Sequence, residues 1–95
     1  MIKINDKKLE RLMTKELNKY YKYDKCYVCI DTIRIVQPTD TKFNYDYCLD
    51  GRYGIELDNG EIQQKDFTID YINKNVSYNK IVGMFLQIFN TKGIL

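Results

Sequence analysis

The sequence predicts an α+β domain with an N-terminal amphipathic helix, a three- to four-stranded antiparallel β meander and a C-terminal helix. Three features of the sequence support this fold class. Apolar residues recur at three- and four-residue spacings near both ends, apolar and polar residues alternate through the middle, and an Asn-Gly pair marks a tight turn between two alternating segments. With 95 residues the chain has room for one domain, which we expect to span residues 1–95.

The first predicted helix begins at Asn5 or Asp6, since either side chain can cap the free N–H groups of the first turn, and ends between Tyr21 and Asp24. Its apolar stripe consists of Leu9, Leu12, Met13, Leu17, Tyr20 and Tyr21. At about 100° per residue, five basic residues fall within about 80° of one another on the opposite face. They are Lys8, Arg11, Lys15, Lys19 and Lys22.

Residues 26–36, CYVCIDTIRIV, favour a strand because they are rich in β-branched side chains. Their apolar positions change phase after Ile30, which predicts either a bulge near Asp31-Thr32 or a strand buried on both faces. Apolar residues then alternate in residues 43–49 and 53–57, with a turn expected at residues 50–52. Residues 66–72 favour a further short strand, with a helix as the alternative.

The pair Asn59-Gly60 predicts a type I′ hairpin turn, because that turn needs positive φ at both central residues. In this register Leu57 faces Ile62 and Glu56 faces Gln63. Near the C-terminus, Ser77 is the expected cap of a second helix that stops around Asn90. The stripe of that helix is wide enough to predict a mostly buried helix and consists of Ile81, Val82, Met84, Phe85, Leu86, Ile88 and Phe89.

The turn expected at residues 50–52 would pair Tyr47 with Ile55 and Asp46 with Glu56, so that the apolar partners share one face. The other face would then collect four acids, Asp46, Glu56, Asp58 and Glu61. Acidic and basic residues are also separated along the chain. Residues 26–72 carry nine acids and four bases, whereas residues 73–95 carry three bases and no acid. A nearly neutral chain of net charge +2 is thus internally polarised.

Two interpretations of these acids remain open. Exposed strand faces are commonly polar, and charge on them discourages edge-to-edge aggregation. Alternatively, a row of carboxylates stands in for phosphates and is drawn into a basic nucleic-acid groove of another protein. Under the second interpretation, Tyr53 or Tyr78 would supply aromatic contact area beside the acids.

Catalysis is not expected, because the chain has no His to act as a general base near neutral pH and its one Ser is placed as a helix cap. The three cysteines are Cys26, Cys29 and Cys48, and in a predicted strand the first two point to opposite faces. Three Cys without His do not supply the four ligands of a zinc site. We expect buried, reduced thiols, no metal and no cofactor.

A polar N-terminus without a signal-like segment, and a longest apolar run of only nine residues at 81–89, predict a soluble, cytoplasmic protein that does not span a membrane. Residue types with AT-rich codons, such as Ile, Lys, Asn and Tyr, dominate the composition. Their abundance indicates a low-GC bacterium, or a phage or plasmid within one.

No motif identifies a family. In size, composition and lack of catalytic groups, the chain is similar in style to phage-encoded inhibitors of host machinery, including anti-CRISPR proteins. This likeness implies a non-catalytic protein-binding module, a phage or mobile-element inhibitor of host nucleic-acid machinery of the anti-CRISPR or another anti-defence type. The contact would be the acidic β-sheet face, and the partner a larger host protein.

The alternative is a small nucleic-acid-binding or regulatory protein that uses the basic face of the first helix. Lysine dominates that face, whereas base readout relies on Arg, Asn and Gln, so direct nucleic-acid binding is the weaker expectation. A homodimer formed through a free strand edge or the last helix is a third candidate.

Overall fold

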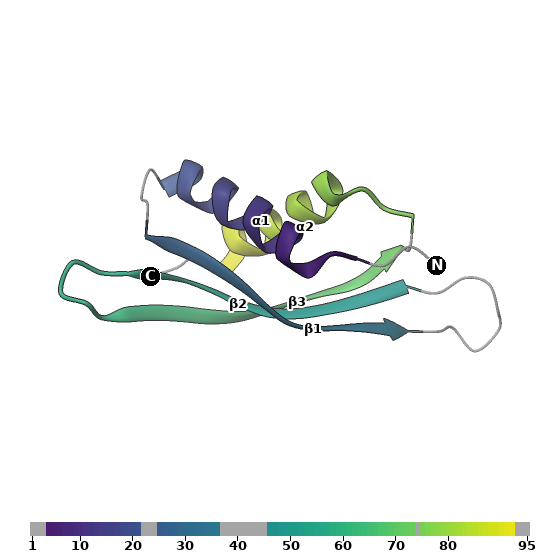
Figure 1. The fold of residues 1–95 in the computed structure, drawn as a ribbon, viewed down its shortest axis with the longest axis horizontal. Coiled ribbons are helices and arrows are strands. Elements are labelled where there is room, and N and C mark those ends of the chain that lie inside the picture. Colours follow the sequence, from purple (N-terminus) through teal and green to yellow (C-terminus); the bar gives the residue numbers. More distant parts are fainter. Residues whose placement is uncertain (1–3, 22–24, 37–45, 74, 93–95) are drawn as a thin grey trace.

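A computed structural model describes residues 4–21, 25–36, 46–73 and 75–92. Its elements follow in the order α1 (Asp6–Tyr21), β1 (Cys26–Val36), β2 (Asp46–Glu56), β3 (Ile62–Asn73) and α2 (Tyr78–Lys92). The strands form one antiparallel sheet in the order β1-β2-β3, and both helices lie on the same side of it (Figure 1). The predicted α+β class and meander are confirmed, with three strands in place of the three or four expected.

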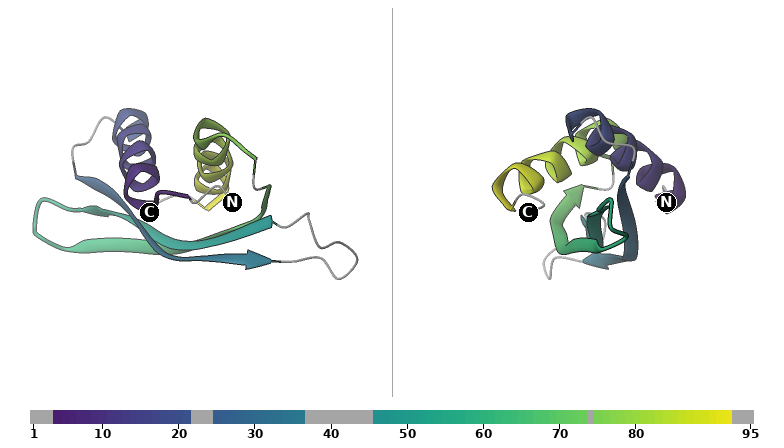
Figure 2. Two further views of the ribbon diagram at one scale, coloured as in Figure 1. Left: turned by 45° about the vertical axis from the view of Figure 1, so that its right-hand side comes forward. Right: turned by 90° about the vertical axis from the view of Figure 1, so that its left-hand side faces the viewer.

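The two helices lie side by side over the sheet, and none of the described segments covers the opposite sheet face (Figure 2). The core fills the space between the layers, where alternate strand residues meet the apolar stripes of α1 and α2. At its centre the ring of Tyr53 lies edge-on to Phe85 and Phe89, with centroids 5.6 Å away in each case. Phe67 completes this cluster, 4.9 Å from Phe85.

Both predicted helix caps are confirmed. The side chain of Asn5 accepts a hydrogen bond from the backbone N–H of Lys8 (3.1 Å), and Ser77 Oγ accepts one from the N–H of Lys80 (3.2 Å). Each satisfies one of the four N–H groups that a helix leaves free at its start. The two helices therefore begin where the sequence places them, and α2 runs two residues beyond the predicted stop at Asn90.

The bulge predicted in β1 is confirmed, since the pairing with β2 shifts between Ile30 and Thr32 and leaves Asp31 as the extra residue. The turn predicted at residues 50–52 is wrong. β2 continues through Gly51, which pairs with Ile30 on one side and Phe67 on the other. The two predicted strands are therefore one, and the part of the prediction at residues 43–45 lies outside the described residues.

Gly51 is present because the sheet is crowded there. A Cβ atom on Gly51 would lie 2.5 Å from the carbonyl oxygen of Cys29 and 2.8 Å from the ring of Phe67. Glycine inside a strand often marks such a close approach, although the pair Asp50-Gly51 taken alone favours a turn. Apolar residues keep the same phase on both sides of it, as a single strand requires.

The hairpin between β2 and β3 is where Asn59-Gly60 predicts it, but its register is displaced by one residue. Glu56 pairs with Ile62, and the N–H of Leu57 donates to the carbonyl oxygen of Glu61 (2.7 Å). Only Gly60 has positive φ (85°) in this loop. The loop thus has three residues, a type I turn followed by a glycine bulge, and not the two of a type I′ turn.

Residues 66–72 are part of β3 and not a separate strand or a helix. Phe67 and Ile69 face the core as alternation predicts, but Tyr71 does not. Leu49 pairs with Ile69 and Tyr47 with Ile72, so β3 holds one extra residue at this point. Ile72 takes the buried position that the alternation assigned to Tyr71.

Helix α1 also protects the first half of the β1 edge. Three side chains at successive turns, Glu10, Thr14 and Asn18, accept hydrogen bonds from backbone N–H groups of β1 that point away from β2. Their donors are Ile30 (2.7 Å), Val28 (3.1 Å) and Cys26 (2.8 Å). Unpaired backbone N–H and C=O groups of an edge strand can pair with a strand of another chain. The bonds from α1 prevent such pairing along the first half of β1.

Replacing Glu10 with alanine is expected to lower the free energy of unfolding by about 1–2 kcal/mol, because the half-buried N–H of Ile30 loses its acceptor. Glu10→Gln keeps an oxygen in place and should retain most of the stability. Urea denaturation followed by circular dichroism measures both variants. Equal losses in the two would show that the charge of Glu10, and not the cap, is what stabilises the fold.

Candidate protein-binding face

The uncovered side of the sheet is called the open sheet face. Strand alternation and the pairing registers place on it Tyr27, Cys29, Thr32, Arg34 and Val36 of β1, Asp46, Cys48, Asp50, Arg52, Gly54 and Glu56 of β2, and Ile62, Gln64, Asp66, Thr68, Asp70, Tyr71 and Asn73 of β3. The carboxylate of Asp31, at the β1 bulge, joins this face through Arg52. Six acids therefore share the face with two arginines, so that its net charge is negative although the whole chain is slightly positive.

A hydrogen-bond network occupies the middle of this face. Asp50 accepts bonds from the hydroxyls of Thr68 (2.8 Å) and Thr32 (3.1 Å), one from each neighbouring strand, and an ion pair from Arg34 Nη2 (3.0 Å). These donors lower the pKa of Asp50, with the bond from Thr68 as the largest cause. Asp50 is thus held ionised and orders the side chains of all three strands, and it is not placed to act as a general base.

The free energy of unfolding is expected to fall at acid pH, partly because the carboxylate of Asp50 becomes protonated. Its pKa is lowered in the folded state, so its contribution is present above the ordinary carboxyl pKa of about 4 and is lost as the pH falls through the folded value. Asp50→Asn should lose stability at neutral pH and show a flatter decline toward pH 3 than wild type, whereas Asp58→Asn in the hairpin loop should follow wild type. Urea unfolding at a series of pH values measures the effect, and an unchanged decline in Asp50→Asn would contradict it.

Two further contacts fix the remaining side chains of the face. Arg52 binds Asp31 through two nitrogens, Nε to Oδ2 at 3.2 Å and Nη2 to Oδ1 at 3.1 Å. The hydroxyl of Tyr27 donates to Gln64 Oε1 (2.7 Å), and a Cβ on Gly54 would lie 2.8 Å from that hydroxyl oxygen. The face is therefore pre-ordered, which lowers the entropy cost of binding a partner.

One corner of the open sheet face presents an aromatic ring among carboxylates. Tyr71 has a φ of 59° and is 76% exposed. Asp70 precedes it, and on the neighbouring strand Asp46 pairs with Asn73, two residues beyond Tyr71. A left-handed backbone is unfavourable for a bulky residue by about 1–2 kcal/mol, so its presence at an exposed tyrosine is a candidate mark of function.

The structure separates the four acids that the sequence grouped. Asp46 and Glu56 were expected to oppose each other, but they lie at the two ends of β2, about 33 Å apart at strand spacing. This pairing is wrong because β2 does not turn at Gly51. Both residues are nevertheless on the open sheet face, and neither makes an ion pair with another described residue.

Asp58 and Glu61 lie in the hairpin loop and immediately after it, beyond the end of the paired strands. Asp58 forms an exposed ion pair with Lys25 Nζ (3.2 Å), which is worth little but offsets its charge. The backbone N–H of Glu61 donates to the side chain of Asn59 (2.9 Å). These two acids therefore extend the hairpin tip and do not belong to the ordered face.

Neither of the tyrosines expected beside the acids is there. Tyr53 is 0% exposed, because odd-numbered positions of β2 face the helices, and its expected place at the surface is wrong. Tyr78 starts α2 on the helical side, where its hydroxyl accepts a hydrogen bond from the N–H of Asn5 (2.8 Å). Asp66, Asp70 and Tyr71 were not among the predicted site residues. The two aspartates can be identified from their alternation with Phe67 and Ile69 in the sequence. The bulge that exposes Tyr71 has no comparable signal in the sequence.

The basic residues predicted on the first helix do share one face of α1. Lys8, Arg11, Lys15 and Lys19 are exposed, opposite the buried Leu9, Met13 and Leu17, and Lys22 lies outside the described residues. The ammonium of Lys8 stands 5.0 Å from the ring centroid of Tyr78. This basic surface and the open sheet face are on opposite sides of the molecule, so two surfaces of opposite charge flank one core.

The cysteines occupy both faces of the sheet. Cys26 is buried beneath the helices, and burial raises its pKa. Cys29 and Cys48 lie on the open sheet face, where Cys48 is buried, donates to Asp70 Oδ1 (3.1 Å) and accepts from Arg34 Nη2 (3.1 Å). The bond to Asp70 and desolvation raise the pKa of Cys48, which keeps it a neutral thiol.

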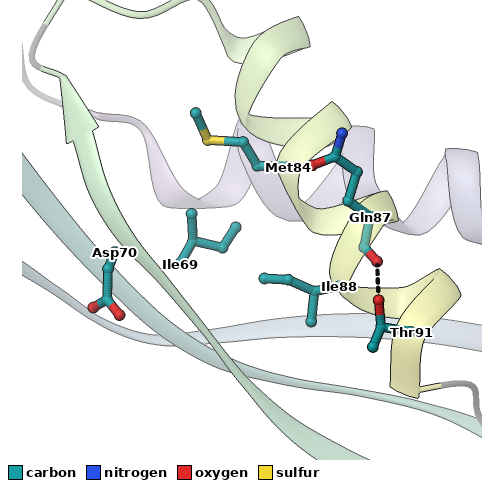
Figure 3. Close-up of a pocket in the computed structure, with 6 residues that line it drawn as sticks. All are labelled: Ile69, Asp70, Met84, Gln87, Ile88 and Thr91. Atoms are coloured by element: carbon teal, nitrogen blue, oxygen red, sulfur yellow. Dashed lines mark hydrogen bonds between the residues drawn. The ribbon is translucent and has the colours of Figure 1, made fainter.

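An apolar groove of about 470 Å³ runs between α2 and β3, next to the corner that carries Tyr71. Ile69, Met84 and Ile88 gather along it, and Asp70 lies at its rim on the strand (Figure 3). The groove adjoins the open sheet face, so a partner bound at Tyr71 would meet both.

None of the described helices has the length and apolar character needed to cross a bilayer. The sequence matches no protein-family model, and no curated protein or solved structure matches the chain.

Proposed function

We propose that the protein is a non-catalytic binding module whose open sheet face contacts a basic surface of a larger protein. The observation that supports this most is Tyr71, an exposed ring held in a left-handed backbone among carboxylates. Exposed aromatic residues on rigid elements are typical anchors of protein interfaces. A carboxylate surface around such an anchor favours a basic partner and speeds encounter at low salt.

The composition and small size of the chain favour a phage or mobile-element inhibitor that acts on host nucleic-acid machinery, of the anti-CRISPR or another anti-defence type. Proteins that handle nucleic acids carry Lys- and Arg-lined grooves, which an ordered acidic sheet complements. The cross-strand network around Asp50 supports this role, because a pre-ordered surface competes better for such a groove than a flexible one.

Reversal of the two acids at the ends of β2, Asp46 and Glu56, tests the proposal. Asp46→Lys combined with Glu56→Lys is expected to reduce partner binding at least tenfold, because attraction to a basic surface becomes repulsion. The tagged variant and wild type are used as baits in lysate of a low-GC bacterium, and retained proteins are quantified by mass spectrometry at two salt concentrations.

The matched control is Asp58→Lys with Glu61→Lys, which changes the charge equally but at the hairpin tip. A protein retained by wild type and by this control, yet lost with the sheet variant, is the expected result. Equal retention by all three baits would refute the role of the open sheet face. Circular dichroism shows that each bait is folded.

The exposed basic face of α1 supports a second candidate, a small nucleic-acid-binding or regulatory protein. Four cations on one face of a rigid helix are suited to phosphate contacts. Mobility shift with short DNA and RNA duplexes at two salt concentrations measures this activity. A shift that weakens steeply with salt and disappears in Lys15→Glu with Lys19→Glu would favour it, and no shift at low salt would exclude it.

A further inference from the structure

The edge of β1 is protected in its first half but not in its second. Up to Ile30, the N–H groups that point away from β2 belong to even-numbered residues, and α1 side chains accept from them. The extra residue at Asp31 changes this phase, because Thr32 and Arg34 then take the positions that bond to β2. The backbone groups of Ile33 and Ile35 therefore point outward, and no other described residue accepts from or donates to them.

The side chains along this open half are apolar on the helical side of the sheet. Ile35 is 50% exposed on this side, whereas Val36, at the strand end, pairs with Asp46 and lies on the open sheet face. A groove of about 600 Å³ runs beside them, lined by the apolar side chains of Ile4, Ile30, Ile33, Ile35 and Tyr47 and by Asp6, Asp31 and Thr32. The sheet is longer than α1, since twelve strand residues span about 40 Å and sixteen helical residues about 24 Å, and α1 does not reach over this end (Figure 1).

We propose that a second copy of this chain pairs with this edge. The two β1 strands run antiparallel across a two-fold axis at Ile33, so that each Ile33 exchanges both backbone hydrogen bonds with its counterpart. Ile33 and Ile35 of both copies then cover the groove. The inference does not depend on the proposed function, but it would join two open sheet faces into one six-stranded sheet.

The register follows from side-chain parity and charge. Directly opposed residues of two paired strands lie on the same side of the sheet. The isoleucines of both copies therefore stay on the helical side only if the two-fold axis passes through a residue position, and not between two residues. An axis at Arg34 would place the two guanidinium groups opposite each other, which is unfavourable. An axis at Ile33 places Arg34 opposite Thr32 of the second copy and one step from its Asp31, a complementary arrangement.

Sedimentation equilibrium from micromolar to millimolar concentration tests the pairing. Wild type should approach twice the 11.4 kDa mass of the chain. Ile35→Asp should raise the dimer dissociation constant at least tenfold, because it places a carboxylate in the seam and opposite Asp31 of the second copy. Ile62→Asp is the matched control, since Ile62 is 59% exposed on the other edge strand, and should leave the dimer intact. A monomer at all concentrations, or equal effects of the two variants, would overturn the proposal.

Two independent measurements fix the register. Amide exchange of Ile33 and Ile35 in wild type should slow as concentration rises, and exchange that does not depend on concentration would overturn the pairing. Mild oxidation of Ile33→Cys should give a disulfide-linked dimer, because directly opposed residues of a hydrogen-bonded pair have Cα atoms about 5.5 Å apart. Ile35→Cys, which has no counterpart opposite itself, should cross-link much less. The reverse order of cross-linking would overturn an axis at Ile33.

Discussion

Gly51→Ala is expected to lower the free energy of unfolding by about 3 kcal/mol, at the upper end of the usual cost of overpacking. The new methyl group would lie 2.5 Å from the carbonyl oxygen of Cys29 and 2.8 Å from the Phe67 ring. A backbone oxygen in the middle of a sheet cannot move aside as a flexible side chain does. Relief of the contact therefore requires β1 and β2 to separate where Asp50 connects all three strands.

Gly83→Ala is the matched control. Gly83 is exposed within α2, and nothing lies within 4 Å of a Cβ placed there. The same chemical change should raise the free energy of unfolding by about 0.5–1 kcal/mol, because alanine favours a helix. Chemical denaturation of the two variants compares them directly. Tolerance of alanine at position 51 would contradict a continuous β2 and favour the turn that the sequence suggested.

Tyr71→Gly is expected to separate stability from binding. Glycine adopts positive φ without strain, so the variant should be more stable than wild type by about 1 kcal/mol. If Tyr71 anchors the partner, its loss should weaken binding by about 2 kcal/mol, or roughly thirtyfold. A residue that destabilises the free protein while strengthening a complex is what selection for binding would retain.

Thermal unfolding measures the first effect, and retention of the captured partner measures the second. Tyr20→Ala is the control for exposed aromatic area, since Tyr20 is 60% exposed on α1, away from the open sheet face. Its binding should match wild type. A Tyr71→Gly variant that binds normally would show that the strained tyrosine is an accident of the bulge and not an anchor.

Periodicity and capping were sufficient to predict most of the fold. The apolar stripes of both helices, their caps at Asn5 and Ser77, and the change of phase in β1 each depend on local residues, and each is confirmed except at the C-terminal end of the α1 stripe, where Tyr20 is 60% exposed. Gly51 was misassigned for a different reason. An Asp-Gly pair has the same local preference in a turn and at a close contact between strands, and only the position of Phe67 across the sheet decides between them.

The candidate site depends more strongly on long-range pairing. Asp46 and Glu56 were placed on the correct face by alternation, but their separation depends on whether β2 turns, which no local signal settled. The hairpin register likewise depends on whether Asn59 adopts positive φ, and it does not. Tyr71 reaches the surface only because β3 accommodates one extra residue opposite β2.

Amide chemical-shift mapping tests the central claim most directly. The isotopically labelled protein is titrated with the partner identified by capture, and shifts are followed residue by residue. If the open sheet face is the contact, the largest changes will fall on β2, on the second half of β3 and above all at Asp70 and Tyr71. Changes concentrated on the basic face of α1, with the sheet unaffected, would contradict the account.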